Sequence, residues 1–230
     1  MEKMRKIATR ALKGAATAAL LAAPAALLAT PLVVRSAGPS AKAWPPGRAV
    51  GANTPLVLKA GDVVTVLAPS GAKTLRGPGT FKVAGGGNAP AFNPRARFSA
   101  MRGAETPPAP GLWDVDVSRS GNVCLTDPAA VVLWRPKSES EAILQVVPAS
   151  GAGQPVAWPA GRLVQRWPQQ LPIADGAEYS LKWADRAEPT RLRFKTLAAV
   201  GEDPTALAKA LIDHGCQSQL DLLIKAAPEE

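Results

Sequence analysis

The stretch Leu112-Trp-Asp-Val-Asp-Val-Ser118 decides the fold class of this chain. Its apolar residues Trp113, Val115 and Val117 alternate with polar ones. A period of two places one set of side chains in a core and the other in solvent, which is typical of a half-buried β-strand. The stretch therefore predicts that the C-terminal half of the chain is built from sheets.

Short apolar runs bounded by turn residues follow this stretch, at a spacing of about 8–12 residues that is typical of an antiparallel β-sandwich. The predicted strands cover residues 123–125, 130–134, 142–147, 155–158, 163–167, 178–183 and 191–196. On the last of them Arg191, Arg193 and Lys195 alternate with apolar residues, and we interpret them as a solvated outer face. This pattern resembles Ig-like or fibronectin-like sandwiches.

The C-terminal residues change to a helical pattern. Asp203 and Pro204 are a good N-cap and a good first helical residue. The helix is predicted to end at Gly215, and a second helical run follows over Cys216–Ala226. We expect a helical hairpin that packs on the sandwich and completes a module over residues 112–226.

The N-terminal half also predicts short strands, over residues 32–35, 56–59, 62–67, 73–76 and 80–83. A turn over residues 68–72 joins two of them into a hairpin. So small a unit favours a compact β-roll over a wide sandwich. Residues 103–111 contain three prolines and are predicted to form a stiff linker after a module spanning residues 32–102. The predicted fold class is mainly β, with a β-roll, an antiparallel sandwich and a C-terminal helical hairpin.

Four segments of the first module carry a resemblance to a known family: Val34–Ser40, Pro46-Gly47, Leu58–Leu67 and Thr74–Phe81. They contain the series Ala-Gly-Asp, strand, turn, strand and Gly-Pro-Gly, and over about residues 32–84 the chain resembles a FecR-type periplasmic domain. The resemblance implies a small, non-catalytic, periplasmic interaction module. Regulators of that family carry a cytoplasmic domain before a membrane span. Only residues 1–14 precede the apolar run of this chain, so the resemblance does not extend to transmembrane signalling.

The N-terminus carries the features of an export signal. A basic segment precedes an Ala/Leu-rich run from Ala15 to Ala29, as in a secretory signal peptide over residues 1–29. An uncleaved inner-membrane anchor over residues 14–34 is the alternative, because that run just reaches the length of a span. Either interpretation places the rest of the chain in the periplasm.

Export also changes the meaning of the net charge. The 230 residues include 27 Lys and Arg against 18 Asp and Glu, a net charge of +9. Five basic residues and Glu2 lie within residues 1–29, so that segment holds +4 and the remainder +5. A modest, dispersed charge on an exported protein argues against a nucleic-acid partner.

Cys124 and Cys216 are the two cysteines of the chain. An even pair in an exported protein predicts a disulfide. The alternative is a thiol enzyme in which His214 activates Cys216 as a nucleophile.

Three tryptophans precede proline: Trp44, Trp158 and Trp167. A Trp-Pro dipeptide favours extended backbone at strand ends and in loops, where an exposed indole ring can stack on a sugar. Packing of these rings against the sandwich rim is the other interpretation. The three tryptophans are the candidate ligand-binding residues, for a peptidoglycan or other glycan.

Candidate catalytic residues are scarce. The chain has one histidine, and Asp114 and Asp116 stand at positions i and i+2 without a partner that would raise the pKa of either carboxyl group. We therefore predict no catalytic residues, no metal site and no cofactor. The expected function is that of a non-enzymatic exported protein that binds an envelope protein partner, with glycan binding as the alternative.

Overall fold

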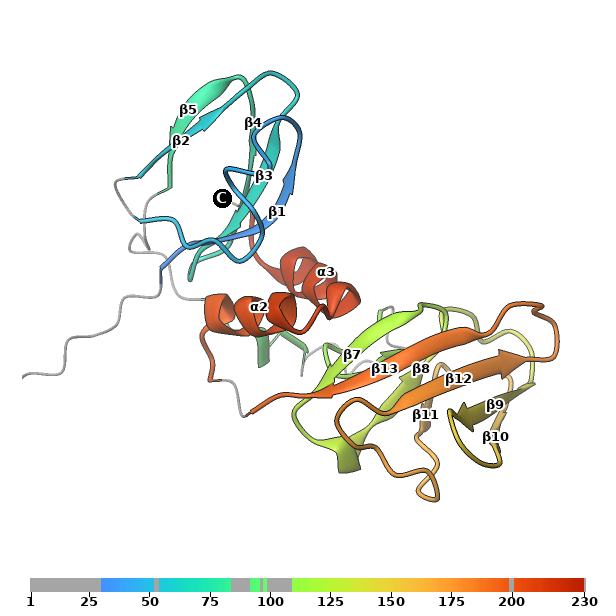
Figure 1. Ribbon diagram of the computed structural model, residues 1–230. Helices are drawn as coiled ribbons and strands as arrows, with labels where there is room; N and C mark the ends of the chain where they lie inside the picture. Colours follow the sequence, from blue (N-terminus) through green and yellow to red (C-terminus); the bar gives the residue numbers. More distant parts are fainter. Residues whose placement is uncertain are drawn as a thin grey trace, which may run out of the picture.

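The computed structural model describes residues 30–51, 54–83, 92–95, 97–98, 109–198 and 201–229. The predicted signal peptide and residues 103–108 of the predicted linker lie outside these ranges. The described residues form a small β module, two helices and a larger β-sandwich, which confirms the predicted mainly β class (Figure 1).

Two small sheets make up the first module. One sheet has the order β1 (Leu32–Ala37), β3 (Val63–Leu67) and β4 (Ala72–Arg76), and β2 (Pro55–Leu58) pairs with β5 (Gly79–Lys82). The apolar core that they share consists of Val33, Trp44, Val50, Leu56, Leu58, Val64, Val66, Leu75 and Val83. The predicted hairpin is confirmed, since β3 and β4 pair in antiparallel orientation from Val63↔Arg76 to Leu67↔Ala72.

Asp62 explains the Ala-Gly-Asp segment of the first module. Its side chain is buried and accepts hydrogen bonds from the backbone N–H groups of Ser40 and Lys59. A Cβ at Gly38 would lie 2.5 Å from the Asp62 Oδ1 atom, and one at Gly77 would lie 2.0 Å from the Lys59 carbonyl oxygen. Glycine at these two positions therefore lets the backbone come close to Lys59 and Asp62. The Asp62 carboxylate in turn holds the backbone of Ser40 and Lys59 in place.

The second module is a two-sheet sandwich. The larger sheet has the order β10 (Gln154–Trp158), β9 (Ala142–Pro148), β12 (Glu178–Trp183), β13 (Thr190–Thr196) and β7 (Gly121–Leu125). The smaller sheet has the order β11 (Val164–Arg166), β8 (Val132–Trp134) and β6 (Val115–Asp116), and a short 3-10 helix, Pro128–Ala130, precedes β8. Most pairs are antiparallel, but β7 pairs with β13 and β6 pairs with β8 in parallel.

The stretch Leu112–Ser118 forms a much shorter strand than its alternation predicts. Only Val115 and Asp116 are in β6, because the two carboxylates close turns on either side of it. Asp114 accepts a hydrogen bond from the Gly111 N–H at 2.6 Å. Asp116 accepts hydrogen bonds from the N–H and hydroxyl groups of Ser118, so the chain turns instead of extending.

The two C-terminal helices are α2 (Pro204–Asp213) and α3 (Gln217–Ala226). The predicted N-cap is confirmed, since the Asp203 carboxylate accepts a hydrogen bond from the Thr205 N–H at 3.0 Å. Gly215 lies between the helices with a φ of 68°, in the left-handed conformation that ends a helix.

The helical hairpin lies between the two β modules, and not against the sandwich alone (Figure 1). Leu32, Val34 and Leu67 of the first module share one buried cluster with Leu211 and Leu220 of the helices. The reason is that the β1–β3–β4 sheet is apolar on both faces. One face packs on β2 and β5, and the helices cover the other.

The hairpin is also fastened to the sandwich. Cys124 of β7 and Cys216 between the helices form the predicted disulfide, with Cα atoms 5.8 Å apart. Beside it, the buried Gln219 side chain of α3 accepts a hydrogen bond from the Cys124 N–H and donates to the carbonyl oxygens of Cys124 and Leu112. The amide group therefore satisfies three backbone groups that the sandwich edge would otherwise bury unpaired.

Candidate functional site

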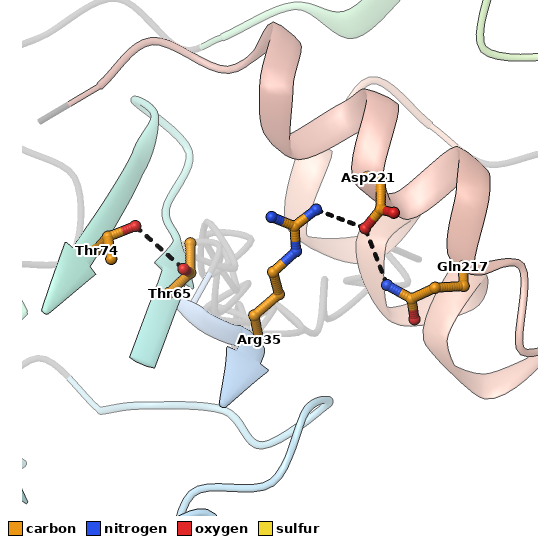
Figure 2. Close-up of polar contacts among 5 residues, drawn as sticks. All are labelled: Arg35, Thr65, Thr74, Gln217 and Asp221. Atoms are coloured by element: carbon orange, nitrogen blue, oxygen red, sulfur yellow. Dashed lines mark hydrogen bonds and ion pairs between the residues drawn. The ribbon is translucent and has the colours of Figure 1, made fainter. Parts of the chain in front are cut away.

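A polar cleft of about 720 Å³ lies where α3 faces the β1–β3–β4 sheet. Arg35, Thr65 and Thr74 form a row across its floor, because Arg35 pairs in register with Thr65 and Thr65 with Thr74. The two threonine hydroxyls are 3.1 Å apart and hydrogen bonded (Figure 2). The sheet thus contributes a polar row to a face that is otherwise apolar.

Helix α3 supplies the opposite wall. Asp221 forms an ion pair with Arg35 and accepts a hydrogen bond from the Gln217 side chain at 3.0 Å (Figure 2). Gln217, Asp221 and Lys225 follow one another at intervals of four residues, which places them on one face of the helix. The Arg35–Asp221 pair therefore joins the sheet to α3 across the cleft, and Lys225 lies one helical turn further along α3.

Two cations of the cleft form no ion pair with a described residue. Arg119, from the loop after β6, and Lys225 are both exposed. Within the described part of the chain the ion pairs are Arg35–Asp221, Arg193–Glu178 and Lys209–Asp213, so neither Arg119 nor Lys225 belongs to one. The carboxylate of Glu229 also lines the cleft, so Arg35, Arg119 and Lys225 stand against Asp221 and Glu229 and the cleft has a net charge of +1. Arg119 and Lys225 are the cations that a carboxylate or phosphate group can neutralise there.

A second hollow of about 230 Å³ continues the cleft toward the sandwich. Arg119, Leu222 and Lys225 line both hollows, so the two meet along one side of α3. The second hollow also contains Asn122 and Trp134 of the sandwich, and the carboxylates of Asp114 and Asp116, which accept hydrogen bonds within their turns. Together they form a groove, here called the α3 groove, that runs from the first β module to the second.

The three candidate tryptophans are buried, as the packing interpretation of the sequence expects and the ligand-stacking interpretation does not. Trp44, Trp158 and Trp167 are 8%, 1% and 7% exposed. Trp167 packs edge-on against Tyr179 and Phe194 in the sandwich core. A sugar needs an open ring face, and none of these three rings presents one.

The guanidinium groups of two arginines cover two of the buried rings. Arg48 lies 4.7 Å from the ring centre of Trp44, and Arg135 lies 5.2 Å from that of Trp158. The indole N–H of Trp44 is 3.4 Å from the Val57 carbonyl oxygen. The tryptophans therefore serve as core and rim packing, the second interpretation of the sequence.

The cysteine, histidine and aspartate candidates have structural partners. The sulfur of Cys216 is bonded to Cys124, which removes the nucleophile that a thiol enzyme needs. His214 is exposed and ends α2, and its carbonyl oxygen accepts a hydrogen bond from Asn122 at 2.8 Å. Asp114 and Asp116 hold turns. Among the described residues no group of three His, Cys, Asp or Glu side chains could hold a metal ion.

Sequence reasoning missed the residues of the α3 groove. The spacing of Gln217, Asp221 and Lys225 marks a polar helix face, and this signal was available. The sequence gives no sign that this helix face lies against the β1–β3–β4 sheet, because Arg35 and Asp221 are 186 residues apart in the chain. Only the tertiary structure brings them together.

Comparison of the chain with protein-family models, curated proteins and solved structures returned no match. The resemblance to FecR-type domains therefore stays a prediction. None of the described helices is long and apolar enough to cross a membrane.

Proposed function

We propose that the protein is an exported, non-enzymatic binding protein of the cell envelope that holds an acidic part of a protein partner in the α3 groove. The observation that carries the proposal is the position of Arg119 and Lys225. Both line the place where the two hollows meet, and neither has an acidic partner in the described residues. Charged residues left unpaired in a groove favour a partner of opposite charge.

Two further features support an exported location. The basic and apolar N-terminal sequence has the pattern of a signal peptide. The Cys124–Cys216 disulfide is of the kind that persists in an oxidising compartment such as the periplasm. A groove built from three separate parts of the fold also suits a macromolecule, since an extended segment can contact both modules at once.

The test is capture of partners from envelope extract with the purified protein as bait. The variant Arg119→Glu/Lys225→Glu reverses both groove charges and should retain less than a tenth of the captured protein. The matched control, Lys137→Glu/Lys182→Glu, makes the same change in net charge at two exposed lysines of the sandwich and should capture as much as the wild type.

Capture should also fall as the salt concentration rises, because screening weakens contacts between exposed charges. Equal capture by the groove variant and the control, or no specific capture by the wild type, would refute the proposal.

A further inference from the structure

Strand β4 is an outer edge of its sheet, and its backbone groups alternate in direction. The Ala72 N–H points away from β3, since it donates to the Pro228 carbonyl oxygen at 2.7 Å. The Gly77 N–H points toward the partner strand and donates to the Asp62 carbonyl oxygen at 2.9 Å. Because alternate residues of an antiparallel pair share one direction, the N–H and C=O groups of Thr74 and Arg76 point outward with those of Ala72.

Residues 228 and 229 pair with the first residue of this edge. Glu229 forms a parallel bridge with Ala72, the first residue of β4. Beyond that bridge, no described residue pairs with the outward backbone groups of Thr74 and Arg76. An exposed row of this kind is a template for a further strand.

The surroundings of the edge select the charge of that strand. Thr74 lines the α3 groove together with Arg119 and Lys225, and Glu229 is the acidic residue beside this edge. Lys73 and Arg76 on β4 itself are exposed, and neither has an ion pair within the described ranges. A second copy of β4 would bring further positive charge to this edge, whereas a strand that carries carboxylates would offset the charge already there.

We infer that the edge of β4, whose outward groups at Thr74 and Arg76 pair with no described residue, pairs with an extended acidic segment of the protein partner, which adds to the sheet as a strand. Its backbone binds the outward groups of Thr74 and Arg76, and its carboxylates contact Arg119 and Lys225. This is strand addition, in which backbone bonds supply affinity and side chains supply selectivity. The inference rests on the proposed function and names the part of the partner that enters the groove.

Hydrogen exchange of the purified protein tests the inference with a defined probe. The probe is a capped decapeptide of alternating Glu and Thr, and the control is the same peptide with Lys in place of Glu. With the Glu peptide, the amides of Thr74 and Arg76 should exchange at least tenfold more slowly. The amides of Lys73 and Leu75 point toward β3 and should not change, and the Lys peptide should have no effect.

Two substitutions at one position separate the backbone from the side chain. Thr74→Pro removes the outward N–H, whereas Thr74→Val removes the hydroxyl and keeps the N–H. Proline is tolerated on edge strands, so Thr74→Pro should fold. The unfolding midpoints of the two variants are compared to check this. The proline variant should bind the Glu peptide about tenfold more weakly than the valine variant, because a backbone hydrogen bond is lost.

Unchanged exchange at Thr74 and Arg76 would overturn the inference, as would equal binding by the two Thr74 variants. If the wild type still captures an envelope protein in an Arg119- and Lys225-dependent way, only strand addition is wrong. If the wild type captures nothing, the proposed function itself fails.

Discussion

Arg135 is the buried cation on which the end of the sandwich depends. Its side chain is 6% exposed and donates to three backbone carbonyl oxygens, those of Ser140, Pro159 and Arg162, at 2.9–3.0 Å. Burial lowers the pKa of the Arg135 guanidinium, and the nearby charge of Glu139 opposes that shift. The side chain thereby joins the end of β8 to the loops on either side of β9 and β10.

The effect of Arg135→Met follows from these contacts. Hydrogen bonds from a charged donor contribute roughly 1.5–3 kcal/mol each, so the three together are worth about 4.5–9 kcal/mol. Methionine also removes the cost of burying a charge, which is several kcal/mol, and keeps most of the apolar stem, but it loses the guanidinium group over Trp158. We expect the free energy of unfolding to fall by about 2–4 kcal/mol.

Urea denaturation followed by tryptophan fluorescence measures this change. Arg135→Lys keeps the charge but not the fork of donors that reaches three carbonyl groups, and its stability should lie between those of the wild type and Arg135→Met. Arg186→Met, at an exposed site, should change stability by less than about 0.5 kcal/mol. A loss below about 1 kcal/mol for Arg135→Met would refute the assignment of Arg135 as the residue that fixes these loops.

Two further predictions concern the first module and the helical hairpin. Burial alone would raise the pKa of Asp62, but the hydrogen bonds from Ser40 and Lys59 and the charge of Lys59 lower it overall. The wild type should therefore lose stability as the pH falls from about 4 through that lowered pKa, and Asp62→Asn should lose this part of the acid dependence in unfolding curves. Reduction of Cys124–Cys216, or Cys124→Ala/Cys216→Ala, should cost about 3–5 kcal/mol in urea denaturation, and an unchanged midpoint would contradict the structural role of the disulfide.

Local patterns in the sequence predicted the elements that local chemistry determines. Asp203 and Pro204 fix the start of α2 through capping and a preset φ, so the sequence alone locates this helix. The β3–β4 hairpin follows from two β-branched runs around a turn. The disulfide follows from the even count of cysteines in an exported chain.

Contacts between distant residues decided the features that were wrong or missed. Trp158 ends β10 and Trp167 follows β11, whereas Trp44 lies in the loop between β1 and β2. The local sequence does not reveal that Arg135 covers Trp158 or that aromatic neighbours enclose Trp167. The alternation at Leu112–Ser118 is real, but side-chain capping by Asp114 and Asp116 competes with strand extension. Neither effect is visible in the period of the hydrophobic pattern.

The α3 groove is the clearest example of a feature that no local pattern predicts. Its walls come from β1, the loop after β6 and α3, which are far apart in the chain. The helices lie between the modules because both an apolar sheet face and the Cys124 edge of the sandwich need cover. A sequence-based division into two independent modules does not anticipate a surface shared by both.

Site-specific photo-cross-linking in intact cells tests the central claim, that the α3 groove binds an envelope protein. A photoreactive residue at Glu229, exposed in the groove, is compared with the same residue at Lys182 on the outer face of the larger sandwich sheet. We predict a discrete cross-linked product from position 229, lost in Arg119→Glu/Lys225→Glu, and none from position 182. No product at position 229, or equal products at both positions, would contradict the claim.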